Sequence, residues 1–282
     1  MLRMVVMANV RSRLFVGAEL GPCTTSELAL AKPLLASIPA QSVVILDRLY
    51  TGSPQLLLVT AAQDRNFIVR AKKNQRWVVT KRLGDNDAQV EIEVSDEARH
   101  KDPSLPRTWS CRAITYRTPR GQHHTLLTSL TDWAAYPAAE VVALYSERWE
   151  IELAYVELKT VVLKQRIALR SRTVVGVYQE AWGMLLAYNL VRREMFEIAA
   201  EAGVPPFRIS FTAAFHYILD EWRWAANTSP GAIPKALRAL REDIAGFILP
   251  PRRSERSYDR VVKRKESPYP RKSTASRKKV AN

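Results

Sequence analysis

A chain of 282 residues with 47% hydrophobic content is long enough to bury the core of one large domain or two small ones. Its 43 Lys and Arg residues outnumber the 28 Asp and Glu residues, and the net charge of +15 favours a polyanion such as nucleic acid as partner. The apolar runs are about ten residues long, whereas a membrane span needs roughly twenty. Cys23 and Cys111 stand far apart without a zinc-binding pattern, so we expect a globular cytoplasmic protein with two unpaired thiols.

The N-terminal part predicts a hairpin and one further strand. Residues 3–10 and 13–20 alternate as two strands of a hairpin, and Val43–Leu46 is a short apolar strand that ends at Asp47. A carboxylate at the end of a buried strand is where α/β sheets present functional groups. The alternative is an Asp that only caps the next helix.

Five further β segments follow, at residues 67–71, 76–83, 88–94, 109–118 and 125–130, and polar turns such as GDND separate them. The alternation in VEIEV predicts a half-buried antiparallel strand. We expect Trp77 and Trp109 to pack under this small sheet.

One segment places four functional side chains at fixed spacing. The run YSERWEIELAYVELK sets Tyr145, Arg148, Glu152 and Lys159 at offsets of three, seven and fourteen. On a helix, at about 100° per residue, these offsets bring the four side chains within an arc of about 60°. The other acids of the segment fall on other faces; they are Glu147, Glu150 and Glu157. Geometry alone therefore singles out Glu152.

This stripe suits a phosphodiester. A carboxylate can hold a divalent metal ion, while Arg and Lys on the same face hold the phosphate oxygens that the metal ion also approaches. The alternative is an amphipathic surface helix with ordinary ion pairs between neighbouring turns.

The spacing Tyr, two residues, Arg, three residues, Glu, six residues, Lys resembles the Y-R-E-K signature of the insertion-sequence 4 (IS4) family of transposases, the DDE enzymes of bacterial mobile elements. The surroundings also resemble that family, with LLTSL at 126–130, AAYPAAEVVALYSERWEIE at 134–152 and a long helical segment at 169–194. Upstream, DRLY at 47–50 resembles the second-aspartate motif of the family. The resemblance covers nearly the whole chain, as the later part of a longer protein.

The resemblance implies an α/β fold of the ribonuclease-H-like type with an inserted antiparallel β-domain. It implies that Asp47 and Glu152 are catalytic metal ligands in a site that binds two Mg²⁺ or Mn²⁺ ions in intact relatives. It also assigns Tyr145, Arg148 and Lys159 to the DNA phosphates of the transposon end. In such β-domains an aromatic ring can receive a flipped base, which is the alternative role of the two tryptophans.

The first aspartate of the family has no counterpart, because residues 1–46 contain no Asp. Glu19 and Glu27 do not stand in the matching place; we interpret them as an exposed strand-end charge and as the first acid of a helix. The chain would thus begin after the first strand of the fold, as an N-terminally truncated member. We expect a sheet with a gap or a repaired edge, since that strand lies in the middle of the sheet in the family.

Four regions are expected. Residues 1–60 form a partial catalytic core with the second-aspartate strand, 61–135 the inserted β-rich domain, 136–250 the core helices that carry the Y-R-E-K motif, and 251–282 a flexible basic tail. Helices are predicted at about 175–202 and 208–226, with their aromatic residues in the core: Trp182, Tyr188, Trp222 and Trp224. The tail holds twelve Lys or Arg residues against three acids, which suits phosphate tracking or merely solubility.

We therefore predict an insertion-sequence transposase that binds terminal inverted repeats and target DNA, cleaves phosphodiesters with a metal ion and transfers strands. It would act as a homodimer in a synaptic complex, without a membrane or small-molecule partner. Activity is expected to be absent or impaired because the first aspartate is missing. The alternatives are a catalytically dead DNA-binding fragment that competes or pairs with intact transposase, and a decayed reading frame without function.

Overall fold

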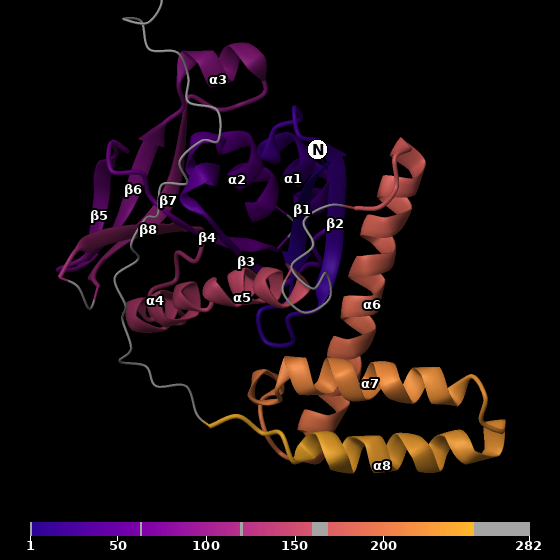
Figure 1. The fold of residues 1–282 in the computed structure, drawn as a ribbon. Helices are drawn as coiled ribbons and strands as arrows, with labels where there is room; N and C mark the ends of the chain where they lie inside the picture. Colours follow the sequence, from indigo (N-terminus) through magenta and orange to yellow (C-terminus); the bar gives the residue numbers. More distant parts are fainter. Residues whose placement is uncertain (1, 63, 119–120, 160–168, 251–282) are drawn as a thin grey trace, which may run out of the picture. The chain divides into compact units, whose positions relative to one another are not determined.

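The structure is a computed structural model that describes residues 2–62, 64–118, 121–159 and 169–250. Residues up to Leu249 form one compact unit. The predicted basic tail, residues 251–282, lies outside the described residues. The elements of the first unit (Figure 1) are, in chain order, β1 (Leu2–Ala8), β2 (Phe15–Pro22), α1 (Glu27–Ala36), β3 (Val43–Leu46), the 3-10 helix η1 (Arg48–Gly52), α2 (Pro54–Ala61), β4 (Asn66–Arg70), β5 (Val78–Gly84), β6 (Asp87–Glu93), α3 (Asp96–Lys101), β7 (Thr108–Arg117), β8 (His123–Thr128), α4 (Ala138–Ser146), α5 (Trp149–Glu157), α6 (Val174–Glu201), η3 (Pro206–Arg208), α7 (Phe211–Ala225), η4 (Pro230–Ala232) and α8 (Ile233–Ala245).

The predicted hairpin is confirmed. Strands β1 and β2 pair antiparallel from Leu2 opposite Pro22 to Ala8 opposite Phe15. Glu19 lies half-buried within β2, opposite Val5, and not exposed at a strand end, because β2 runs on to Pro22.

A six-stranded sheet has the order β3-β4-β8-β7-β6-β5, in which only β3 and β4 are parallel. The middle of β4 is an apolar run with exposed fractions of 0 to 2%, as expected for a strand covered on both faces; it comprises Phe67, Ile68 and Val69. In β6, Val90 and Ile92 are buried while Glu93 is exposed, which confirms the predicted alternation. Strands β3 and β4, which lie before and after residue 60, pair in this one sheet. The division into a core and an inserted domain stays a prediction.

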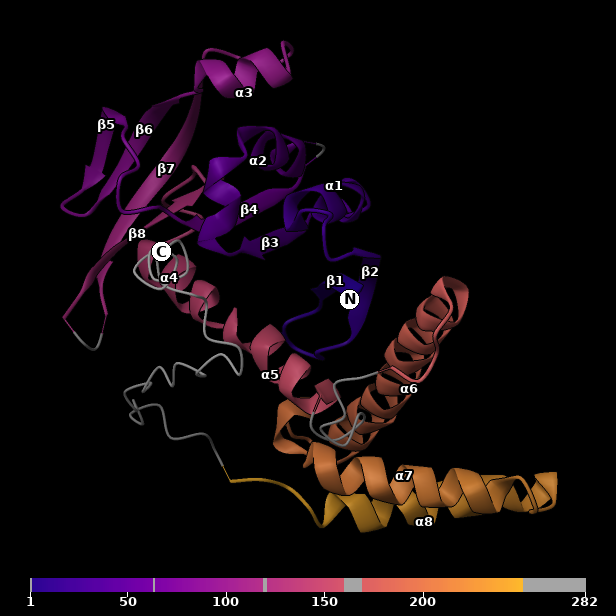
Figure 2. The same ribbon diagram turned by 45° about the horizontal axis from the view of Figure 1, so that its top comes forward.

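Within the described residues, no ladder joins the hairpin to β3. The gap that a missing first strand would leave in the sheet stays a prediction. Figure 2 shows β1 and β2 as a sheet of their own, separate from β3 and β4.

Local capping explains where the helices begin. Ser26, Thr173 and Ser210 each precede a helix, and each side-chain oxygen accepts a backbone N–H from the first turn of α1, α6 and α7, respectively. Glu27 is the first residue of α1, as predicted. None of the helices in the described ranges is both long and apolar enough to cross a bilayer.

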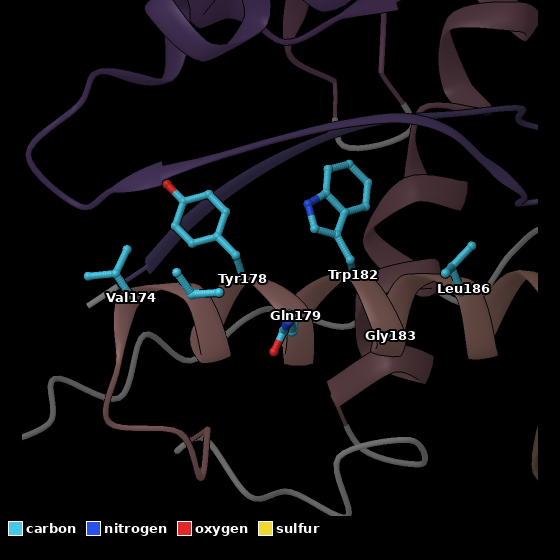
Figure 3. A pocket seen from close by; sticks show the side chains of 7 residues that line it. Val174, Tyr178, Gln179, Trp182, Gly183 and Leu186 are labelled. Atoms are coloured by element: carbon cyan, nitrogen blue, oxygen red, sulfur yellow. The ribbon is translucent and has the colours of Figure 1, made fainter.

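The prediction that the C-terminal aromatic residues lie in the core holds for Tyr188, which is fully buried, and is wrong for three tryptophans. Trp182, Trp222 and Trp224 have exposed fractions of 42%, 37% and 71%. On α6 the core face is formed by Ala181, Leu185 and Tyr188, and Trp182 is rotated about 100° from Ala181. Figure 3 shows the resulting apolar face along α6, with Val174, Tyr178, Trp182 and Leu186 around a shallow hollow.

Trp109 is 7% exposed and packs against Phe67 with ring centroids 6.0 Å apart, and Trp77 is a half-buried neighbour of the same cluster. The prediction that these two residues pack under the sheet is confirmed.

Candidate metal and DNA-phosphate site

Asp47 follows β3 directly and is exposed at the carboxyl end of that strand. Its side chain accepts the N–H of Arg48 at 2.5 Å and caps η1. The capping role is therefore present. It does not exhaust the carboxylate, which has lone pairs on both oxygens for further partners such as a cation.

The segment predicted as one helix forms two. Helix α4 ends at Ser146 and α5 begins at Trp149, and Arg148 N–H donates to the Tyr145 carbonyl at 3.1 Å across three residues. The Ser146 hydroxyl donates to the Ala143 carbonyl at 2.5 Å, a side-chain bond of the kind that bends helices. Because three-residue bonds wind the chain more tightly than an α-helix, the continuous-helix arc of about 60° does not apply across this junction.

The junction nevertheless brings Arg148 and Glu152 together. An Arg148 guanidinium nitrogen lies 3.2 Å from Glu152 Oε1, and both side chains are partly exposed, at 21% and 35%. Arg148 also lies over the ring of Trp149, 5.5 Å from its centroid. Glu152 stands in the first turn of α5, where the positive end of the helix dipole favours a carboxylate.

Tyr145 connects this pair to Asp47. The ring is 8% exposed, and burial raises the pKa of its hydroxyl, with Arg148 opposing the rise and Asp47 adding to it. Ile45 of β3, two residues before Asp47, packs against the apolar cluster that contains Tyr145. The end of β3 and the segment that carries Tyr145 therefore lie on neighbouring parts of the fold, although they are about a hundred residues apart in the chain.

Arg70 also acts on the Tyr145 hydroxyl, and the sequence analysis did not identify it. Leu46, the last residue of β3, pairs with Val69 of the parallel strand β4. Asp47 therefore follows β3 directly, and Arg70 is the last residue of β4. The carboxyl ends of parallel neighbours meet at one edge of the sheet, and that rule applied to FIVRA at 67–71 would have found Arg70.

His123 and His124 begin β8 and pair with Arg117 and Tyr116. Gly121, two residues before β8, takes a positive φ of 77°, which glycine adopts without strain. Burial, then Arg70, lowers the pKa of His124.

Lys159 lies over the ring of Tyr155, 5.5 Å from its centroid. It stands beyond the end of α5 and directly before residues 160–168, which lie outside the described ranges. The described contacts link Tyr145, Arg148 and Glu152 to one another and place Lys159 beside a different aromatic ring.

The donor set suits a hard cation in kind, because Mg²⁺ and Mn²⁺ prefer carboxylate oxygens and water. Across the described part of the chain, no three Asp, Glu, His or Cys side chains form a group that could hold a metal ion. Glu27 lies 3.4 Å from the Tyr50 hydroxyl. The roles of Asp47 and Glu152 as metal ligands stay a prediction.

Comparison with known proteins agrees with the motif. The family described as "Transposase DDE domain" matches residues 1–190. The chain is 34% identical over 270 residues to the transposase InsG for insertion sequence element IS4 of Escherichia coli (strain K12), covering 95% of this chain and 61% of that protein. It is also similar, at 12% identity and a TM-score of 0.45, to a chain in the cryo-EM structure of the piggyBac transposase synaptic complex with hairpin DNA, covering 91% of this chain and 53% of that one. The chain thus spans less than two thirds of the length of either relative. On the family match and the sequence identity, the chain belongs to the IS4 family of DDE transposases.

Proposed function

We propose that the meeting of Asp47, Tyr145, Arg148 and Glu152 is the part of a transposition site that binds a transposon end and one divalent metal ion. Two observations support the proposal: Tyr145 belongs to an apolar cluster against which Ile45 of β3 packs, and Asp47 and Arg148 both affect the pKa of its hydroxyl. The surrounding fold would be ribonuclease-H-like, and the DNA partners would be the terminal inverted repeats and the target. In its cell the protein would act in the cytoplasm, as a homodimer in a synaptic complex.

Each side chain has a distinct task in this proposal. Arg148 would donate to a non-bridging phosphate oxygen, and Tyr145 would donate its hydroxyl, which burial keeps protonated. Lys159 would add a point charge to the neighbouring phosphate. Arg148 pairs with Glu152 in the structure, and a phosphate would compete for that guanidinium.

Asp47 and Glu152 would hold Mg²⁺ or Mn²⁺. The bound ion would activate a water molecule or a 3′-hydroxyl as the nucleophile, and it would stabilise the leaving oxygen. The two carboxylates would fix the place of that ion, and the cationic side chains would fix the position of the phosphodiester beside it.

A second candidate function is a DNA-binding fragment that cleaves poorly or not at all and competes or pairs with intact transposase. The observation that favours it is the absence of a three-carboxylate group among the residues that the structure describes. Residues 1–46 also lack any Asp.

The test is nicking of DNA that carries the ends of the insertion sequence, with Mg²⁺ or Mn²⁺ added to the full chain. Glu152→Gln should reduce nicking at least about a hundredfold, because it removes one of two metal ligands. Glu147→Gln is the matched control, since it makes the same change of charge at the α4–α5 junction.

Equal nicking by both variants would contradict the assignment of Glu152. Salt-sensitive binding of the same DNA without nicking by the unmodified chain would establish the fragment as the better description.

A further inference from the structure

Two carboxylates of α5 face away from Glu152 and enter an ion network. Arg13 lies 2.5 Å from Glu150 Oε2 through one guanidinium nitrogen and 2.5 Å from Glu157 Oε1 through another. Arg192 of α6 forms an ion pair with the other oxygen of Glu157. Glu157 thus bridges two arginines from different elements, one in the β1–β2 turn and one in α6.

The network is buried, and each of its four charged side chains forms an ion pair with at least one other member. The side chains of Arg13 and Arg192 are 5% and 1% exposed, and those of Glu150 and Glu157 are 14% and 15% exposed. The Tyr188 hydroxyl lies 3.0 Å from Glu157 Oε2, and Arg192 Nε donates to that hydroxyl at 3.1 Å.

Such pairs add little net stability, because desolvation of the charges opposes their attraction. Their hydrogen bonds have directions, however, and removal of one partner leaves a buried charge unmatched. A network of this kind is therefore better suited to fixing a geometry than to raising stability.

The backbone at Arg13 supports the same interpretation. Arg13 has a φ of 59°, in the left-handed region that few residues other than Gly, Asn and Asp adopt. The turn around it is held by the Asn9 side chain, which accepts the N–H groups of Arg11 and Ser12. A strained backbone conformation persists only where the surrounding structure stabilises it. Here the carboxylates of Glu150 and Glu157 on α5 form ion pairs with the Arg13 side chain.

The same turn is fixed to α6 by a second contact. The amide side chain of Asn189 accepts the N–H of Phe15 at 2.9 Å and donates to the carbonyl of Phe15 at 2.8 Å. The hairpin turn, α5 and α6 therefore form one junction, in which the ion pairs of Glu150 and Glu157 stand beside the apolar packing of Ala154 and Leu158.

We propose that Arg13 and Arg192 are positioning residues that hold α5 through Glu150 and Glu157, so that Glu152 stands in a fixed place opposite the sheet that carries Asp47. The proposal rests on the proposed function for the significance of Glu152, and on the ion network for its geometry. Arg13 and Arg192 act on the site through α5 and touch neither the metal ion nor DNA.

The experiment measures the position of residue 152 directly. One spin label at Glu152→Cys and a second at Val79→Cys, an exposed position on β5, report the distance between α5 and the six-stranded sheet in a Cys23→Ala full chain. Arg13→Asn removes the guanidinium but keeps a residue that tolerates the left-handed region. We expect it to broaden the distance distribution about twofold, and Arg192→Met to do the same, since each removes ion pairs that hold α5.

Gln41→Asn is the matched control. Gln41 is exposed, has a φ of 58° and lies outside the network, so this substitution repeats the backbone change without loss of an ion pair. We expect an unchanged distribution. Glu157→Gln is a second test, because Gln has nearly the same shape as Glu. It removes the negative charge between the two arginines and should also broaden the distribution of distances.

Narrow distributions in Arg13→Asn, Arg192→Met and Glu157→Gln would overturn the proposal. A loss of circular dichroism equal to that of an unfolded chain in all three would overturn it too, because the network would then be a general support of the fold. Arg13→Lys, which keeps one charge, should lie between Arg13→Asn and the unmodified protein. The distance does not depend on cleavage, so a chain that fails to nick DNA leaves this result standing.

Discussion

The hydroxyl of Tyr155 gives the stability of this protein a pH dependence at its alkaline end. Burial, followed by the nearby Glu27, raises the pKa of Tyr155 to about 12, although a hydrogen bond from the Val6 backbone opposes the rise. In the unfolded chain the same hydroxyl ionises near pH 10. Its pKa is therefore higher in the folded state, so its contribution to stability is complete below about pH 10 and is lost as the pH rises towards 12.

We expect Tyr155→Phe to lose less stability than the unmodified protein between pH 9 and pH 11. The measurement is the midpoint of urea unfolding at both pH values. Tyr217→Phe is the control, because that ring is 41% exposed on α7. Equal losses in Tyr155→Phe and the unmodified protein would contradict the assignment of the pH dependence to Tyr155.

Single residues differ in how far the sequence predicts them. Asp47 and Glu152 could be predicted because each has a local signal, a strand end and a fixed spacing. Arg13 could not be assigned, since its partner Glu157 lies far along the chain and only the tertiary fold brings the two close. The contact of Lys159 with Tyr155, four residues earlier, is one that helical spacing allows.

At the scale of elements, one buried arginine joins the sheet to the segment that leads into α4. Arg112 of β7 is fully buried and donates to both carboxylate oxygens of Asp87, at 2.8 and 2.5 Å. Its remaining nitrogen donates to the carbonyls of Leu130 and Tyr136, at 3.3 and 2.7 Å. The loop from β8 to α4 is thus attached to β7 through one side chain.

We expect Arg112→Met to lower the free energy of unfolding by about 3–5 kcal/mol, since Asp87 and two carbonyls would lose their partner in a buried place. Urea unfolding measures the change. The double variant Arg112→Met with Asp87→Leu should recover part of it, because no unmatched carboxylate remains. A double variant less stable than Arg112→Met would mean that the ion pair is not the source of the effect.

Strands and long helices were predictable as elements because their periodicity is local. The eight strands found among the described residues fall on the predicted segments, and α6 begins at Val174 and ends at Glu201, close to the predicted 175–202. The junction between α4 and α5 was not predictable from periodicity, since it depends on one hydroxyl bond within a segment of continuous helical pattern. The exposure of the three tryptophans could not be predicted for a related reason. Periodicity identifies the apolar face of a helix, but it does not show whether another element covers that face.

For the whole molecule, positive charge is the property that most affects its behaviour with DNA. Of the fifteen net positive charges, nine belong to residues 251–282, where twelve Lys or Arg residues stand against three acids. The other six net positive charges belong to residues 1–250. Attraction to phosphates that ignores base sequence should therefore arise chiefly from the C-terminal segment.

Deletion of residues 251–282 tests this expectation. Binding to duplex DNA of arbitrary sequence should weaken, and the slope of log K against log salt should fall by about 0.9 for each phosphate contact that is lost. A chain of full length in which the twelve basic residues are Gln is the matched control for length, and it should behave like the deletion. If the slope stays the same in both, the segment serves solubility, and the phosphate contacts belong to the folded unit that contains Arg148 and Arg70.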